Sequence, residues 1–298
     1  MSRVPHRGRF APSPTGPLHF GSLVAAMASY ADARSQNGKW MVRIEDVDEL
    51  RCQDGAERQI LATLTNCGMS WDGELQHQSD RKQNYARALE CLVSRGVAFR
   101  CNCSRNTVAA SGRLGPEGPI YPGTCRATPP PIGAAAAWRA RVEDRAVSVA
   151  DRICGAITQN LAQDIGDFII KRIDGYTAYQ LAVVVDDQDQ GISHVVRGAD
   201  LLWSTPRQVW LQDMLGYRHP QYAHVPLVYG LDGHKLSKRD SAHPIDDQNP
   251  LPAMLSAWSY LGQVTPAHRI RSTTEFWQWS LPRWHIDAVP KDRTCADE

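Results

Sequence analysis

A Pro- and Gly-rich segment near the start of the chain has the side chains and the position to bind phosphate. A loop at residues 12–17 follows an expected strand at 8–12, and an Ala-rich helix is expected to start at Ser22. Backbone N–H groups at a helix start attract anions, Gly21 lets the backbone approach closely, and His19 can donate to a phosphate oxygen. The segment predicts a phosphate site, although a turn with one histidine also fits a purely structural role.

A second segment, residues 235–239, clusters cations that could oppose the charge of a triphosphate. Lys235 and Lys238, with Ser237 between them, follow a glycine-bearing loop at residues 230–234. Clustered cations of this kind neutralise a bound triphosphate and the pyrophosphate that leaves it. A solvated basic turn would have the same composition, so the segment predicts a phosphate clamp only together with the first one.

Both segments need a scaffold, and the order of elements around the first one predicts an α/β fold. After the expected strand and the helix at residues 23–34, Asn37-Gly38 is a helix stop and residues 39–44 form a second strand. Strand, loop, helix and strand in this order open a doubly wound parallel sheet. The further expected elements are helices at residues 55–67 and 80–95, a second α/β portion at 166–229 and a helix that opens at Ser204.

Composition adds limits on compartment and partners. The 298 residues include 33 Lys and Arg against 32 Asp and Glu, so bulk charge predicts no nucleic-acid surface beyond a local patch. No apolar run approaches the roughly 20 residues of a membrane span, and the start of the chain lacks the apolar stretch of a secretory signal. The eight cysteines are therefore expected to be reduced thiols or metal ligands, in a cytoplasmic protein without a membrane partner.

The two phosphate segments together resemble the signatures of the class I aminoacyl-tRNA synthetases. His19-Phe20-Gly21-Ser22 is similar to their HIGH signature, and Lys235-Leu236-Ser237-Lys238-Arg239 to their KMSKS signature. The opening at residues 9–16 and the segments at 42–46, 179–187 and 194–198 resemble the glutamyl-tRNA synthetases, so the resemblance covers about residues 5–240. It implies a Rossmann-type fold and the activation of an amino acid with ATP and Mg²⁺.

The chemistry of four side chains agrees with the glutamate that this resemblance implies. Arg9 and Arg197, each at an expected strand end, can bind a carboxylate bidentately. Glu45, just beyond the second strand, can receive the α-ammonium, and Tyr179 adds a hydroxyl donor. The alternatives are surface ion pairs for the arginines and a turn cap for Glu45.

The resemblance also assigns residues to roles. The implied glutamate-binding residues are Arg9, Phe10, Ala11, Pro12, Ser13, Glu45, Tyr179 and Arg197. The implied ATP-binding residues are His19, Gly21, Ser22, Lys235, Ser237 and Lys238, of which His19, Lys235 and Lys238 are also the implied catalytic residues.

Three cysteines lie close together in a segment that looks like an insertion. Cys101, Cys103 and Cys125 supply three thiols, whereas a structural zinc ion needs four ligands. The segment resembles a zinc-binding module of the glutamyl group in which a Cys-x-Cys pair is followed by Tyr-x-x-x-Cys, which implies one structural Zn²⁺ with Tyr121 as the fourth ligand. The alternative is three free cysteines, with water or a neighbour completing any metal site.

The chain resembles closely a truncated paralogue group of the glutamyl-tRNA synthetases. Such an enzyme activates L-glutamate without tRNA and transfers it to the queuosine base at the wobble position of tRNA(Asp); we expect it to act as a monomer. The expected parts are the first half of a Rossmann catalytic domain (1–98), an inserted subdomain with the zinc site (99–165), the second half with the KMSKS-like loop (166–240) and a short helical region without an anticodon-binding domain (241–298).

Three other functions remain open on the sequence. A truncated glutamyl-tRNA synthetase would charge the 3′ end of tRNA(Glu). A different adenylate-forming relative would need other carboxylate-binding residues. A non-catalytic paralogue would only bind glutamate or tRNA.

Overall fold

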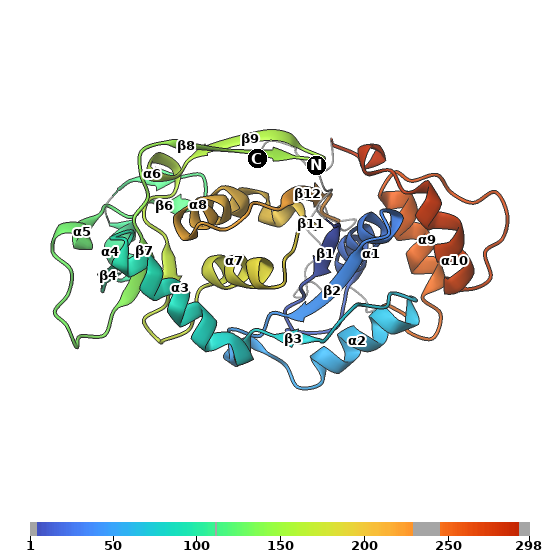
Figure 1. The fold of residues 1–298 in the computed structure, drawn as a ribbon, viewed down its shortest axis with the longest axis horizontal. Coiled ribbons are helices and arrows are strands. Elements are labelled where there is room, and N and C mark those ends of the chain that lie inside the picture. Colours follow the sequence, from blue (N-terminus) through green and yellow to red (C-terminus); the bar gives the residue numbers. More distant parts are fainter. Residues whose placement is uncertain (1–4, 111, 229–244, 292–298) are drawn as a thin grey trace.

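A parallel sheet forms the centre of the structure, a computed structural model that describes residues 5–110, 112–228 and 245–291 (Figure 1). Strand β1 pairs in parallel with β2, and β2 with β3. On the other side of β1 lies β11, where the Ser193 N–H donates to the Arg7 carbonyl at 3.0 Å, and β11 pairs in parallel with β12. The strands are β1 (Arg7–Phe10), β2 (Lys39–Ile44), β3 (Gln76–His77), β11 (His194–Gly198) and β12 (Gln221–Val225).

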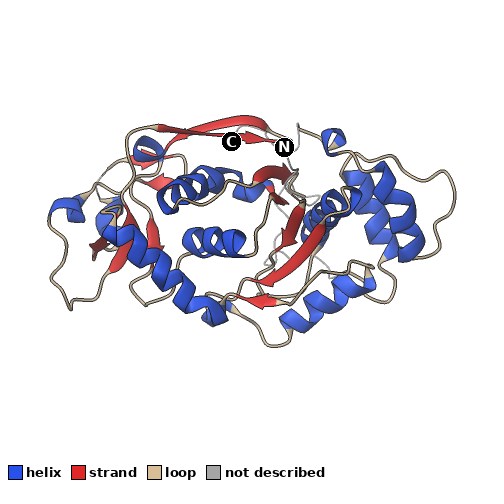
Figure 2. Ribbon diagram, in the orientation of Figure 1, coloured by secondary structure: helices blue, strands red, loops and turns tan. Residues whose placement is uncertain are grey.

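Helices cover both faces of this sheet, so the predicted doubly wound α/β fold is confirmed (Figure 2). Successive residues of a strand point to opposite faces. Val196 accordingly belongs to the core beside α1, and Val195 to the core formed with α3, α7 and α8. The helices and short 3₁₀ turns of this part are α1 (Phe20–Ser35), η1 (Glu49–Arg51), α2 (Ala56–Asn66), η2 (Ser79–Arg81), α3 (Lys82–Ser94), α7 (Tyr179–Asp189), η3 (Ala199–Ser204) and α8 (Thr205–Leu215).

The ends of the first strand and helix differ from the prediction, and the reasons are local. Helix α1 begins at Phe20 rather than at Ser22, because His19 caps it through Nδ1, which accepts from the Ser22 N–H at 3.2 Å. Strand β1 ends at Phe10 rather than at Pro12, a residue without an N–H for a ladder hydrogen bond.

The predicted stop after α1 is confirmed, as is the second strand at Lys39–Ile44. Asn37 has a φ of +52°, in the left-handed region that ends helices. A Cβ on Gly38 would lie 2.5 Å from the His6 carbonyl oxygen, so only glycine fits the turn into β2.

In the sequence, a segment with its own small antiparallel sheet, β10-β7-β4, separates β3 from β11. A long hairpin, β8–β9, extends from this segment across the molecule and reaches the central sheet, where Asp151 pairs with Tyr222 of β12 (Figure 1). The elements are β4 (Ala98–Cys101), α4 (Arg105–Ala109), β5 (Leu114–Gly115), β6 (Gly118–Pro119), α5 (Thr124–Ala127), β7 (Ala137–Ala140), β8 (Ala146–Asp151), β9 (Gly155–Asn160), α6 (Leu161–Asp164) and β10 (Ile169–Lys171). The domain boundaries stay a prediction.

The C-terminal helices pack on α1, on its side away from the sheet. Trp258 and Trp277 of these helices are buried in the core beside α1, and the Trp277 indole donates to the Cys67 carbonyl at 2.8 Å. Helix α1 is therefore covered on two sides, which explains its run of small buried alanines. The elements are α9 (Leu251–Tyr260), α10 (Thr273–Ser280), η4 (Leu281–Arg283) and η5 (Ile286–Ala288).

The structure bears on two expectations from composition, the absence of a membrane span and the reduced state of the cysteines. Within the described residues, no helix combines the length and the apolar character that a bilayer crossing requires. Among the residues that the structure describes, six cysteines carry free thiols, including the three of the insertion. Cys154 is disulfide-bonded, so the expectation of reduced thiols is wrong at this position.

Candidate active site and metal centre

One cavity of about 340 Å³ lies at the carboxyl ends of β1, β2 and β11. It is lined by every predicted glutamate or ATP residue that the structure describes: Arg9, Phe10, Ala11, Pro12, Ser13, His19, Gly21, Ser22, Glu45, Tyr179 and Arg197. Lys235, Ser237 and Lys238 lie outside the described residues. The fold thus brings segments far apart in sequence to one sheet edge, where α/β proteins bind ligands.

A buried ion-pair network holds Arg9, which projects from the strand β1. Asp187 of α7 accepts from Arg9 Nε at 3.3 Å and from Arg43 Nη1 at 2.9 Å. Burial alone would raise the pKa of Asp187, but Arg9 and Arg43 outweigh it and hold this pKa below its usual range. Asp187 is therefore a carboxylate that fixes both arginines, and Arg9 is already paired before any ligand binds.

Glu45 and Tyr179 are two polar side chains of the cavity. Burial disfavours the charged form of each. Glu45 accepts from Arg43 Nη2 at 3.2 Å, yet burial raises its pKa above the ordinary value, against the opposing effect of Arg43. Burial also raises the pKa of the Tyr179 phenol, which keeps it a neutral donor. An ammonium group beside Glu45 would offset its desolvation, so the site favours a cationic ligand group there.

Arg197 is held differently from Arg9. It is only 5% exposed, and within the described residues it forms no ion pair. Its Nε donates to His224 Nε2 at 3.0 Å and its Nη2 to Thr205 Oγ1 at 2.9 Å, while Nη1 lies 3.4 Å from the Tyr179 hydroxyl. A buried guanidinium without an anionic partner is suited to bind a ligand carboxylate.

The other end of the cavity is formed by the start of helix α1. His19 Nδ1 accepts from the Ser22 N–H, which places the proton of a neutral ring on Nε2, 3.1 Å from Ser22 Oγ. Positive partial charge at a helix N-terminus attracts phosphate. The predicted phosphate loop therefore faces the same space as the carboxylate-binding arginines.

Sequence reasoning missed several residues of this site. Leu18, Ala25, Asp200, Leu201 and residues 226–228 also line the cavity. Leu18 could have been found, since it adjoins His19, and Asp200 because it follows the strand that ends at Gly198. Arg43 and Asp187 lie in segments that resemble the glutamyl group, but spacing alone did not indicate their pairing.

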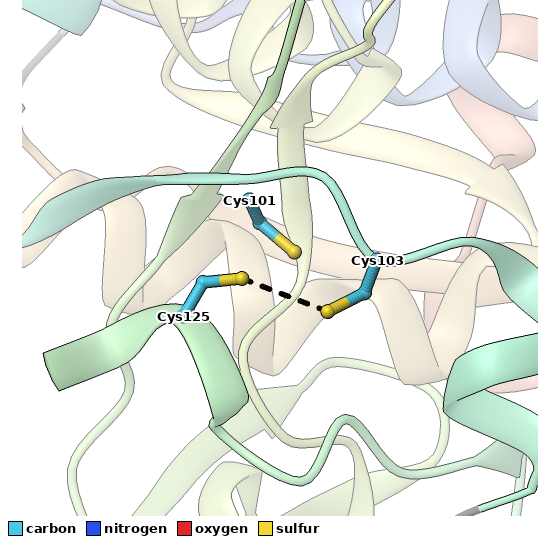
Figure 3. Close-up of side chains that lie close together, drawn as sticks. All are labelled: Cys101, Cys103 and Cys125. Atoms are coloured by element: carbon cyan, nitrogen blue, oxygen red, sulfur yellow. Dashed lines mark hydrogen bonds between the residues drawn. The ribbon is translucent and has the colours of Figure 1, made fainter. Parts of the chain in front are cut away.

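The three cysteines of the inserted segment do converge (Figure 3). Their sulfur atoms lie within 4.8 Å of one another, and Cys103 Sγ is 3.6 Å from Cys125 Sγ. Ligand sulfurs about 3.8 Å apart are what tetrahedral coordination at about 2.3 Å requires. The cluster could therefore hold a metal ion.

The Tyr121 hydroxyl lies beside these thiols. It is 3.4 Å from Cys101 Sγ and 3.9 Å from Cys103 Sγ, and it accepts from the Cys125 N–H at 2.7 Å. The Arg139 guanidinium stacks over the phenol ring at 4.0 Å, and its Nε lies 3.3 Å from Cys101 Sγ. The phenol oxygen of Tyr121 thus lies within 4 Å of two of the three thiols.

Known proteins with similar sequences cover nearly the whole chain. Residues 6–267 match the family of class I tRNA synthetases (E and Q), catalytic domain. Glutamyl-Q tRNA(Asp) synthetase of Thiobacillus denitrificans is 49% identical over 290 residues, which are 97% of this chain and 96% of that protein. The protein of the same name from Neisseria meningitidis serogroup C is 48% identical over 289 residues, which cover 96% and 98% of the two chains.

A similar solved structure is a glutamate tRNA ligase from Elizabethkingia meningosepticum in complex with its amino acid. It superposes with a TM-score of 0.81 at 25% identity and covers 97% of this chain. This chain spans 66% of that structure's length.

Proposed function

The chain belongs to the class I tRNA synthetases (E and Q), and on that premise we propose that it activates L-glutamate with ATP and transfers it to the queuosine base at the wobble position of tRNA(Asp). The observation behind the glutamate part is one cavity in which Arg9, Glu45, Tyr179 and Arg197 face the start of helix α1. Two guanidinium groups suit two carboxylates, and Glu45 suits the single ammonium.

Glutamyl-adenylate forms when the α-carboxylate attacks the α-phosphate of ATP and pyrophosphate leaves. The residues supply positioning and charge stabilisation rather than a general base. His19 and the N-terminus of α1 meet the phosphates, and Lys235 and Lys238 neutralise the leaving pyrophosphate. Mg²⁺ bound with ATP would add positive charge there. This assignment of roles rests on the resemblance of the two phosphate segments and on the position of the first one at the cavity.

Transfer follows when a hydroxyl of the queuosine cyclopentenediol attacks the carbonyl of the mixed anhydride. An ester forms, AMP leaves and the hydroxyl loses its proton. The choice of this acceptor is supported by the relatives named Glutamyl-Q tRNA(Asp) synthetase, which match this chain over nearly their full length.

The inserted segment, we propose, binds one structural Zn²⁺ through Cys101, Cys103, Cys125 and Tyr121. The spacing of the three sulfur atoms and the position of the Tyr121 hydroxyl beside Cys101 support this donor set. A bound Zn²⁺ would stabilise the thiolate and phenolate forms of its ligands. Its role is structural, because within the described residues none of the four lines the cavity.

Labelled glutamate and ATP, incubated with tRNA(Asp) that carries or lacks queuosine and with tRNA(Glu), test the function. We expect label only on queuosine-containing tRNA(Asp), and glutamate-dependent ATP–pyrophosphate exchange without any tRNA. Label on the 3′ end of tRNA(Glu) alone would instead establish the charging enzyme, and no exchange would rule out tRNA-independent activation. Lys238→Ala should reduce the exchange strongly while glutamate binding persists, since the change removes charge only at the pyrophosphate.

A further inference from the structure

We infer that Asp151, which lies outside the cavity, orients the glutamate-binding Arg197 by fixing which nitrogen of His224 carries the proton. Asp151 and His224 are thus positioning residues, and this role rests on the proposed glutamate function. Asp151 ends β8 of the inserted hairpin, and His224 lies in β12 of the central sheet. Through Asp151, the inserted segment thus contributes to substrate binding.

The three side chains form a buried line of hydrogen bonds. His224 Nδ1 lies 2.7 Å from Asp151 Oδ2, and Arg197 Nε donates to His224 Nε2 at 3.0 Å. His224 is 0% exposed, and Asp151 and Arg197 are each 5% exposed. Water therefore does not compete for these bonds, and each group depends on its partner.

The two contacts of the imidazole determine where its proton lies. A carboxylate only accepts, so His224 Nδ1 must carry a proton; Arg197 Nε only donates, so His224 Nε2 must be unprotonated. Burial lowers the pKa of His224 to about 4, in spite of Asp151, so the ring is neutral at pH 7. The neutral Nδ1–H tautomer is the only form that satisfies both neighbours.

Asp151 is itself held rigidly. Its Oδ1 accepts from the N–H groups of Ile153 and Cys154 at 2.9 and 2.8 Å, and from the His224 N–H at 3.3 Å. These bonds leave Oδ2 aimed at the imidazole. The tight turn after β8 thus orients the carboxylate, which orients the imidazole.

A neutral acceptor suits Arg197 better than a carboxylate would. Asp187, in direct contact with Arg9, partly neutralises that guanidinium. His224 and Thr205 fix the direction of Arg197 Nε and Nη2 without cancelling its charge, and Nη1 lies beside Tyr179 at the cavity. The full charge of Arg197 then remains for a ligand carboxylate.

Asp151→Asn tests the inference with almost no change in volume. The amide oxygen can still accept from Ile153 and Cys154, but the NH₂ group now faces His224 and forces the proton to Nε2, against Arg197 Nε–H. We expect the KM for glutamate in ATP–pyrophosphate exchange to rise about 10- to 100-fold, with kcat and the KM for ATP changed less than about 3-fold. Asp144→Asn, at the other end of the hairpin, is the matched control and should leave both KM values unchanged.

A double variant separates positioning from stability. In Asp151→Asn/His224→Gln, the amide oxygen introduced at position 224 can accept from Arg197 without help from position 151, so the glutamate KM should fall back toward that of the wild type. A merely structural role would predict further loss in the double variant instead. An Asp151→Asn enzyme with the wild-type glutamate KM would overturn the inference.

¹⁵N NMR of histidine-labelled protein reports the tautomer without any turnover. We expect the His224 proton on Nδ1 in the wild type and on Nε2 in Asp151→Asn; a wild-type proton on Nε2 would refute the inference by itself. Wild-type protein that lacks exchange but shows the expected tautomer, and binds glutamate more tightly than Asp151→Asn in calorimetry, would refute the proposed activation and leave the positioning role standing.

Discussion

Two arginines face the same cavity in different electrostatic settings. Arg9 shares Asp187 with Arg43, whereas the partners of Arg197 within the described part of the chain are all neutral: His224, Thr205, Tyr179 and the Leu201 carbonyl. A paired guanidinium must exchange part of its interaction with Asp187 for a ligand, while an unpaired buried one gains a counter-ion. Arg197 should therefore contribute more to glutamate binding than Arg9.

Arg197→Lys keeps the positive charge but replaces the planar guanidinium, with its several N–H donors, by a single ammonium group. An ammonium cannot donate to His224 and Thr205 and also present a second donor at the cavity, so we expect the KM for glutamate to rise about 100-fold and the KM for ATP to stay within about 3-fold. Exchange kinetics at varied glutamate and ATP measure both constants. Arg145→Lys, an exposed position on the hairpin side, should behave as the wild type. Equal glutamate constants in the two variants would contradict this assignment.

At the scale of elements, the inserted segment has too small a core to be stable on its own. Phe99, Cys101, Val108, Tyr121 and Cys125 form its separate hydrophobic cluster. Cores of this size are usually reinforced by a metal or by disulfides. Cys101 ends strand β4 and Cys125 lies in helix α5. A metal bound by these thiols would therefore link two short elements.

Metal analysis should find about one zinc per chain, and Cys125→Ser should lose it. Because the binding energy of a structural zinc is folding energy, a chelator should lower the Tm of the wild type but not that of the variant. Glutamate-dependent exchange should persist, since the cluster lies outside the cavity. Cys91→Ser, at a free thiol of α3, is the control and should keep the metal. Wild-type protein free of metal at an unchanged Tm would rule out the zinc site.

At the scale of the whole molecule, two histidines that stay neutral, the buried His224 and the half-buried His194, predict instability in acid. Burial lowers the pKa of His224 to about 4, and burial also lowers that of His194, stacked 3.7 Å from His6, to about 4. Their unfolded values are about 6.5. Between pH 6.5 and 4 the unfolded chain therefore binds more protons than the folded one, and the free energy of unfolding falls as the pH falls.

His224 alone should account for about 3 kcal/mol of this loss between pH 6.5 and 4. Urea unfolding at pH 7.5, 6.0 and 5.0 should show a midpoint that decreases at each step. His224→Gln removes one titrating group, so its midpoint should depend less on pH, even if it is lower at pH 7.5. A midpoint that stays constant down to pH 5 would show that these imidazoles are not held neutral.

Much of the fold and part of the site could be predicted because they depend on local sequence. Strand β2, the stop at Asn37-Gly38 and the start of α8 beside Pro206 follow from alternation, turn residues and proline placement. Arg9, Glu45 and Arg197 could be placed at one edge because parallel strands end together. The grouping of Cys101, Cys103 and Cys125 could be predicted because the three lie close together in the sequence.

The sequence by itself determined the element order, the phosphate loop at the start of α1 and the residue types that suit glutamate. Only the tertiary structure decided which partners hold them: Asp187 for Arg9, 178 positions away, and His224 for Arg197, itself joined to Asp151 across 73 positions. Such pairs have no characteristic spacing, because a buried polar side chain takes its partner from whichever element packs against it. The same packing removes water, so each of these hydrogen bonds becomes necessary and orients the groups that face the ligand.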